Sequence, residues 1–171
     1  MSTERLQKDF FTRDVLTVAR ELPGTRLVLL ENGIERSYII TETEAYRGTD
    51  DLACHASKGM TPRTEVMFRE GGIIYMYLIY GMYWMMNIVT SVENDPQAVL
   101  IRGLDIVNGP GRLTRELGLD RSYNGESLVK SPRIWLEEGE KPVKLLSSPR
   151  IGINYAGEPW ISKPWRFYVP D

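Results

Sequence analysis

The amino-acid sequence predicts an α+β fold: a single domain, residues 1–171, with a curved antiparallel β-sheet core and peripheral helices. Three observations lead to this prediction. The chain has 171 residues, the length of one ordinary domain, and can bury a proper core. Apolar runs rich in β-branched and aromatic residues recur between turn signals, which is typical of antiparallel strands. Helical spacing of apolar residues occurs only in short stretches, which we expect to pack around the sheet.

The first helix is expected from Thr12 to Leu22. Its apolar residues recur at the spacing of one helix face, namely Val15, Leu16, Ala19 and Leu22. Thr12 is a suitable N-cap, and Pro23-Gly24 ends the pattern. We therefore expect a helix packed on the core.

A β-hairpin is expected next. Strands at 26–30 and 34–43 flank Glu31-Asn32-Gly33, and an Asn-Gly step between apolar runs is a strong signal for a tight hairpin turn. The second strand leads directly into Glu44.

The rest of the chain is predicted as a long loop followed by further strands. Gly48, Gly59 and Pro62 interrupt any regular structure through Arg63, so we expect a functional loop with a short helix near Thr64. Gly109-Pro110-Gly111 is expected to start a helix at 112–117. Further strands are expected at 73–79, 84–89, 98–104, 134–136 and 167–169. No internal repeat or linker is present.

The segment 73–92 also allows a different interpretation, because its 20 residues carry no formal charge and could cross a bilayer as a helix. Its four tyrosines, Asn87 and Gly81 favour two buried strands joined at a turn. We therefore expect no membrane association. The N-terminus also lacks the basic start and apolar run of a signal peptide, so the expected location is cytoplasmic, and nucleoid-associated in a prokaryote.

Charge and cysteine content narrow the function classes. The net charge is −2 with a pI near 5.6, which disfavours nucleic-acid binding unless basic side chains gather on one face. Folding could bring such a set together, namely Lys58, Arg63, Arg69, Arg102, Arg112 and Arg115. Cys54 is the single cysteine, so the chain forms no internal disulfide, and one Cys with one His makes no zinc cluster. We expect neither metal nor cofactor.

Carboxylates and aromatic side chains concentrate between Thr41 and Asn87. If 41–46 is extended, Glu42, Glu44 and Tyr46 share one face. The alternative is a polar edge strand with a solvated face, and spacing does not distinguish Glu42 from Glu44 as the reactive group.

The same period places Tyr75 and Tyr77 on one side of the strand at 73–79, with Tyr80-Gly81 at its turn. Tyr80 is therefore expected to project from the surface. Tyrosines that fill a core, and an ordinary surface imidazole at His55, are the alternatives. Together these residue types suit an enzyme that holds a flat aromatic base beside an activated water.

An ordered set of motifs covers nearly the whole chain. It comprises Thr43-Glu44-Ala45-Tyr46, His55, Thr61-Pro62-Arg63, Met67-Phe68, 75–83, Asn87, Val99-Leu100-Ile101-Arg102, Asn108-Gly109-Pro110, 148–152 and 163–169. In order and spacing this set resembles the alkyladenine (3-methyladenine) DNA glycosylase family. The resemblance implies a base-excision repair enzyme that flips a damaged purine out of double-stranded DNA and hydrolyses its N-glycosidic bond.

The resemblance also implies a role for each matching residue. Glu44 would activate the attacking water and Arg102 would hold that water. The pocket for the extruded base would be formed by Tyr46, His55, Tyr77, Asn87 and Leu100. Tyr80 and Met82 would intercalate where the nucleotide left the helix. We expect a monomer, because an enzyme with such a wedge needs no second subunit.

Elementary chemistry agrees with these roles. Glycosidic cleavage passes through a sugar with oxocarbenium character, so one carboxylate can stabilise positive charge and also take a proton from water. The lysine nearest the motif is Lys58 in the loop, so no Schiff-base lyase step is expected. Two other functions stay open at this point: a non-catalytic nucleic-acid-binding module with a tyrosine stacking platform, and a hydrolase of free nucleosides.

Overall fold

Strand β2 (Ile34–Tyr46) lies inside the strand order of the sheet, between β5 and β1. The computed structural model describes residues 4–171, and within them nine strands form one antiparallel sheet with the central order β3-β4-β5-β2-β1-β7. The other strands are β1 (Arg26–Glu31), β3 (Ile74–Ile79), β4 (Tyr83–Thr90), β5 (Gln97–Leu104), β6 (Val107–Asn108), β7 (Ile134–Glu137), β8 (Leu146–Ser148) and β9 (Arg166–Tyr168). The predicted α+β class with an antiparallel sheet core is confirmed.

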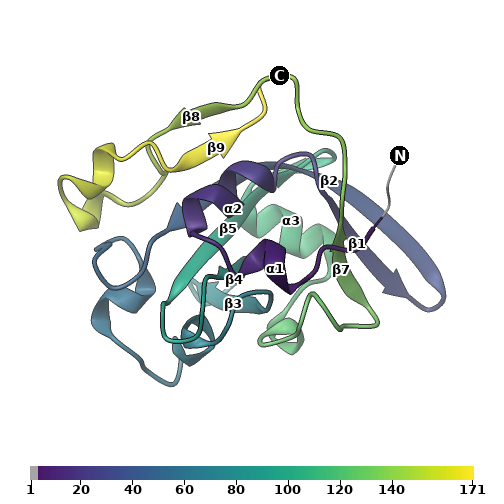
Figure 1. The fold of residues 1–171 in the computed structure, drawn as a ribbon, viewed down its shortest axis with the longest axis horizontal. Helices are drawn as coiled ribbons and strands as arrows, with labels where there is room; N and C mark the ends of the chain where they lie inside the picture. Colours follow the sequence, from purple (N-terminus) through teal and green to yellow (C-terminus); the bar gives the residue numbers. More distant parts are fainter. Residues whose placement is uncertain (1–3) are drawn as a thin grey trace.

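The two halves of β2 have different neighbours. The first half pairs with β1, and the second half lies between β5 and β9. The register with β5 shifts on both sides of Glu42, as in a β-bulge. Figure 1 shows β9 in yellow with β8 in olive green next to it, and β9 is the strand that pairs with this second half. The motif from Thr41 to Tyr46 is therefore central, and the alternative interpretation of it as a polar edge strand is wrong.

Short helices cover the sheet (Figure 1). They are α1 (Lys8–Phe11), α2 (Val15–Glu21), α3 (Pro110–Leu117) and the 3-10 helices η1 (His55–Lys58), η2 (Glu65–Phe68), η3 (Arg121–Tyr123), η4 (Asn154–Ala156) and η5 (Trp160–Ser162). The predicted first helix is shorter than expected. Asp14 and not Thr12 is its N-cap, because the Asp14 carboxylate accepts a hydrogen bond from the Leu16 backbone N–H.

One face of β2 points into the main core. Thr43 and Ala45 are fully buried, and the Thr43 hydroxyl donates to the Ala19 carbonyl of α2. Apolar residues of α2, α3 and the sheet complete this core, among them Val18, Leu113, Ile88 and Ile101. Since side chains alternate along a strand, Glu44 points to the opposite face.

The predicted strands occur within a few residues of their expected bounds, while β6 and β8 were not expected. The loop after Tyr46 contains η1, and η2 lies close to the helix expected near Thr64. The charge-free segment forms β3 and β4. In the described part of the chain no helix has the length and apolar character needed to cross a bilayer.

Candidate active site

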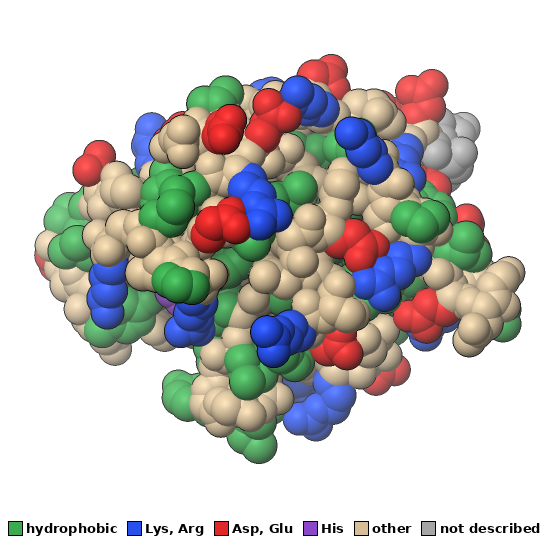
Figure 2. Space-filling view, turned by 90° about the horizontal axis from the view of Figure 1, so that it is seen from below, with side chains coloured by type: hydrophobic (Ala, Val, Ile, Leu, Met, Phe, Trp, Pro, Cys, Tyr) green, Lys and Arg blue, Asp and Glu red, His purple; other side chains and the backbone are tan. Residues whose placement is uncertain are grey.

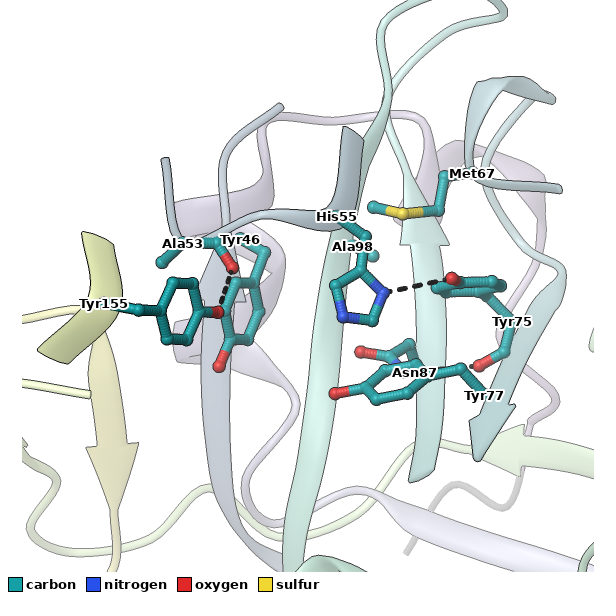
Figure 3. A pocket seen from close by; sticks show the side chains of 9 residues that line it. All are labelled: Tyr46, Ala53, His55, Met67, Tyr75, Tyr77, Asn87, Ala98 and Tyr155. Atoms are coloured by element: carbon teal, nitrogen blue, oxygen red, sulfur yellow. Dashed lines mark hydrogen bonds between the residues drawn. The ribbon is translucent and has the colours of Figure 1, made fainter. Parts of the chain in front are cut away.

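A small pocket opens on the face of the sheet that carries Glu44. Its cavity volume is about 30 Å³, room for about one water molecule. Side chains from β2, β3, β4, β5 and the segments around η1, η2 and η4 line it, namely Tyr46, Ala53, His55, Met67, Tyr75, Tyr77, Asn87, Ala98 and Tyr155 (Figure 3).

Aromatic rings form two opposing walls of this pocket. His55 and Tyr77 make one wall, with ring centroids 4.3 Å apart, and Figure 3 shows Tyr46 and Tyr155 on the other side. The Tyr75 hydroxyl and His55 Nδ1 are 3.1 Å apart and share a hydrogen bond. A flat ring placed between the walls would stack on aromatic side chains from both sides.

Glu44 lies beside the pocket and is fully buried. Its Oε1 accepts a hydrogen bond of 2.8 Å from the Tyr46 hydroxyl, and its Oε2 accepts one of 2.7 Å from the Ile151 backbone N–H. Arg102 Nη1 lies 3.7 Å from Glu44 Oε1. Burial raises the pKa of the Glu44 carboxyl, while the charge of Arg102 and these two hydrogen bonds act in the opposite direction.

Glu42 has a different environment on the same face. Its Oε2 accepts hydrogen bonds from Arg102 Nε at 3.1 Å and from Arg166 Nε at 2.8 Å. Since Arg102 contacts both carboxylates, Glu42 and Glu44 share a face, as predicted. Only Glu44 hydrogen-bonds to a side chain that lines the pocket, so the geometry makes the distinction that residue spacing could not.

His55 is a neutral imidazole at neutral pH. Burial, together with the smaller effects of the charges of Arg63 and Lys58, lowers its pKa to about 4. Burial also raises the pKa of the Tyr77 hydroxyl on the same wall. The alternative of an ordinary surface imidazole is wrong, and the pocket wall carries no positive charge of its own at pH 7.

The β3–β4 turn projects apolar side chains into solvent. Tyr80 is 88% exposed and Met82 is 63% exposed. Tyr80 and Gly81 both have positive φ, 51° and 66°, as the two central residues of a type I′ turn require. The predicted projection of Tyr80 is confirmed.

On the face shown in Figure 2, the basic side chains form no large patch. Figure 2 shows Lys and Arg side chains scattered among acidic and apolar ones on the face seen from below. Of the expected basic set, Arg69 pairs with Glu65, and Arg102 is held by Glu42 inside the site. Arg63 and Arg115 instead lie over the rings of Tyr77 and Tyr83 near the exposed turn.

Most of the predicted site residues meet in this region. Leu100 differs, because it is buried in β5 opposite Glu44 and Asn87 and does not line the pocket. Asn87 does line it, and its side-chain amide donates to the Tyr75 carbonyl.

Sequence reasoning assigned no role to several residues around the pocket: Asp51, Ala53, Met67, Tyr75, Ala98, Arg150, Ile151 and Tyr155. Among the residues of the C-terminal segment that contribute to the site, only those in the motif at 148–152 had a sequence signal. Within residues 4–171, no group of three or more His, Cys, Asp or Glu side chains could hold a metal ion.

Comparison with known proteins identifies the family of this chain. The model of the family described as methylpurine-DNA glycosylase matches residues 9–109 and 104–171. A protein of Myxococcus xanthus, named by inference a 3-methyladenine DNA glycosylase, is 46% identical over 97% of this chain and 90% of its own length. Relatives with the same name in Methanocella arvoryzae (42% identical, 95% of this chain and 91% of theirs) and Desulfitobacterium hafniense (40%, 98% and 96%) are similar. The chain therefore belongs to the methylpurine-DNA glycosylase family.

Proposed function

We propose that the protein is a monofunctional DNA glycosylase that removes alkylated or deaminated purines from duplex DNA with a water activated by Glu44. Family membership supports DNA glycosylase activity on alkylated bases such as 3-methyladenine. The observation that carries the mechanism is the buried Glu44 carboxylate, hydrogen-bonded to Tyr46 at the edge of an aromatic pocket.

In the proposed step, the Glu44 carboxylate takes a proton from water while the water oxygen bonds to C1′. The C1′–N bond breaks, and its electron pair leaves with the purine. An alkylated purine that is already cationic leaves as a neutral base, so it needs no general acid. General-base assistance of this kind contributes roughly 10² to 10⁴ in rate.

The aromatic walls suit an extruded purine. Tyr46 on one side and His55 with Tyr77 on the other would stack on its two faces, and Asn87 lies at the pocket's inner surface. The cavity of about 30 Å³ holds only about one water, so the walls must separate when a base enters. Since the wall imidazole is neutral, it does not repel a cationic alkylated base.

The exposed turn suits a duplex substrate. Extrusion of a base costs a few kcal/mol, less for a damaged or mispaired base. Tyr80 and Met82 could offset this cost by filling the space left in the helix, as apolar wedges do. This feature favours duplex DNA over free nucleosides or single strands. A wedge of this kind requires no second subunit, so we propose that the protein acts as a monomer.

No lysine is among the nine side chains that line the pocket in the part of the chain that the structure describes. A Schiff-base intermediate with C1′ needs such an amine. We therefore expect an abasic site as the final product, without strand cleavage.

Duplex oligonucleotides that carry a methylated adenine, hypoxanthine or ethenoadenine test this function. We expect free base to be released from at least one of them, with strand breaks appearing only after alkali treatment. Free nucleosides should stay intact. Binding without base release would favour the stacking module, cleavage of nucleosides would favour the nucleoside hydrolase, and breaks without alkali would exclude a monofunctional enzyme.

A further inference from the structure

Asp51 and Arg150 form a fully buried ion pair next to the candidate active site. Both side chains are 0% exposed. Arg150 Nη1 donates to Asp51 Oδ2 at 2.6 Å, and Nη2 donates to Oδ1 at 3.0 Å, across 99 residues of sequence. Neither residue lines the pocket. Any effect of the pair on the reaction must therefore pass through the residues that it contacts.

The guanidinium contacts the strand that carries Glu44. Arg150 Nη1 donates at 3.0 Å to the carbonyl of Ala45, the residue between Glu44 and Tyr46. The guanidinium carbon also lies 4.9 Å from the ring centroids of both Tyr46 and Trp165. Arg150 thus contacts both the backbone of β2 at Ala45 and the ring of Tyr46.

The residue after Arg150 contacts the carboxylate directly. The Ile151 backbone N–H donates to Glu44 Oε2 at 2.7 Å. Because Arg150 is anchored by Asp51, the position of this N–H depends on the ion pair. The second Glu44 oxygen is therefore held from the C-terminal segment, and the first one from Tyr46 on β2.

Asp51 shapes the other side of the pocket. Its Oδ2 accepts the Arg47 backbone N–H and its Oδ1 accepts the Ala53 backbone N–H, both at 3.0 Å. Ala53 lines the pocket, and its carbonyl accepts the Tyr155 hydroxyl at 3.0 Å. One carboxylate therefore fixes the loop that leads to His55 and also the arginine.

Stability alone is a weak reason for such a pair. Buried ion pairs stabilise little relative to apolar side chains of the same volume, because both charges lose their hydration. Here Arg150 Nε is also buried without a hydrogen-bond partner, which is a further cost. In the orientation that leaves this atom unpaired, the guanidinium lies over the rings of both Tyr46 and Trp165.

We propose that Asp51 and Arg150 are positioning residues that hold the Tyr46 ring and the Ile151 N–H in register with the Glu44 carboxylate. This inference rests on the proposed function. It predicts that loss of the two Arg150–Asp51 hydrogen bonds slows base release in molecules that are still folded. The reason is that a displacement of about 1 Å in a reacting group can cost about 10²-fold in rate.

The charge of Arg150 provides a second readout. It lowers the pKa of Glu44, whose buried carboxyl has a raised pKa overall. The other charged or titratable groups around Glu44 are Arg102, Glu42, Arg166, Tyr46, Tyr77 and Tyr155. Removing the Arg150 charge leaves these in place and should move the acid limb of the pH–rate profile to higher pH.

The test compares Arg150→Lys and Arg150→Gln with wild type in single-turnover base release from a lesion duplex at saturating protein. We expect Arg150→Lys, which keeps the charge, to be about 10²-fold slower with an unmoved acid limb. Arg150→Gln should be slow and also show the shifted limb. Arg133→Lys is the matched control, because it likewise keeps the charge and loses the paired hydrogen bonds to a carboxylate, here Glu126. This contact shares no residue with the pocket, so the variant should keep the wild-type rate.

Folded Arg150 variants with the wild-type rate and pH profile would overturn the inference while the wild type still releases base. No base release by the wild type would instead contradict the proposed function. If neither Arg150 variant folds, Asp51→Asn, which keeps the side-chain shape, is measured in the same way. A folded Asp51→Asn with the wild-type rate, or failure of all three to fold, would make the pair a stability element and overturn the proposal.

Discussion

At the scale of single residues, two glutamates on one strand show how environment separates similar side chains. Glu42 lies between two arginines and is held by charge-assisted hydrogen bonds. Glu44 is fully buried, and burial raises its pKa although Arg102 lies near it. A carboxylate with a raised pKa is a stronger base in its ionised form, which suits the removal of a proton from water.

His55 makes a prediction about stability and pH. Its pKa is about 4 in the folded protein and about 6.5 when unfolded, so the unfolded chain binds the proton first as the pH falls. The contribution of the neutral, buried ring is complete above pH 6.5 and is lost as the pH falls towards 4. Its full size is on the order of 3 kcal/mol.

Urea unfolding at pH 7 and at pH 4.5 measures this effect. Wild type should lose more unfolding free energy between the two values than His55→Gln, whose side chain does not titrate. An equal loss in both proteins would show that His55 is not held neutral by burial.

At the scale of elements, two hairpins of the sheet have turns in which two consecutive residues take positive φ. Asn32-Gly33 between β1 and β2 has φ values of 53° and 76°, and Tyr80-Gly81 between β3 and β4 has 51° and 66°. Asparagine adopts this left-handed conformation readily, whereas a bulky side chain such as tyrosine is strained there. Tyr80 is almost fully exposed, so packing does not compensate the strain. This combination supports the wedge role proposed for Tyr80.

Replacing Tyr80 with asparagine should separate stability from function. Tyr80→Asn should be more stable than wild type, with a free energy of unfolding about 1 kcal/mol higher, because the turn strain is relieved. Base release from duplex DNA should fall by about tenfold or more, because the wedge no longer offsets unstacking.

Thermal unfolding and base-release assays measure both effects, and Tyr80→Phe is the control that keeps the ring and the strain. It should retain the duplex activity and the wild-type stability. Unchanged duplex activity in Tyr80→Asn would refute a wedge at this position.

At the scale of the whole molecule, the sequence predicted the elements that have local signals. Asn32-Gly33 defined the first hairpin, and the charge-free run interrupted at Gly81 defined the second. The N-cap of the first helix was predicted at Thr12, whereas the structure has it at Asp14. Both residue types are good N-caps, and only the hydrogen bond from the Leu16 N–H to Asp14 distinguishes them. The short strands β6 and β8 lack any periodicity long enough to detect.

The candidate site was predictable only in part, for a related reason. Residues on β2 and β3 have motifs and a period that place them on one face. The Ile151 N–H carries no sequence signature, because every residue except proline has one. The contact between Asp51 and Arg150 joins segments 99 residues apart, so only the folded chain reveals it.

The central claim is that the Glu44 carboxylate activates the water that cleaves the glycosidic bond. Base release by Glu44→Gln under single-turnover conditions, together with its affinity for lesion duplex, tests this claim most directly. Glu35→Gln is the matched control, since it makes the same change on the exposed half of β2. We expect Glu44→Gln to bind lesion DNA as wild type does but to release base at least about 10²-fold more slowly. Glu35→Gln should behave as wild type in both assays. Base release by Glu44→Gln at the wild-type rate would contradict the central claim.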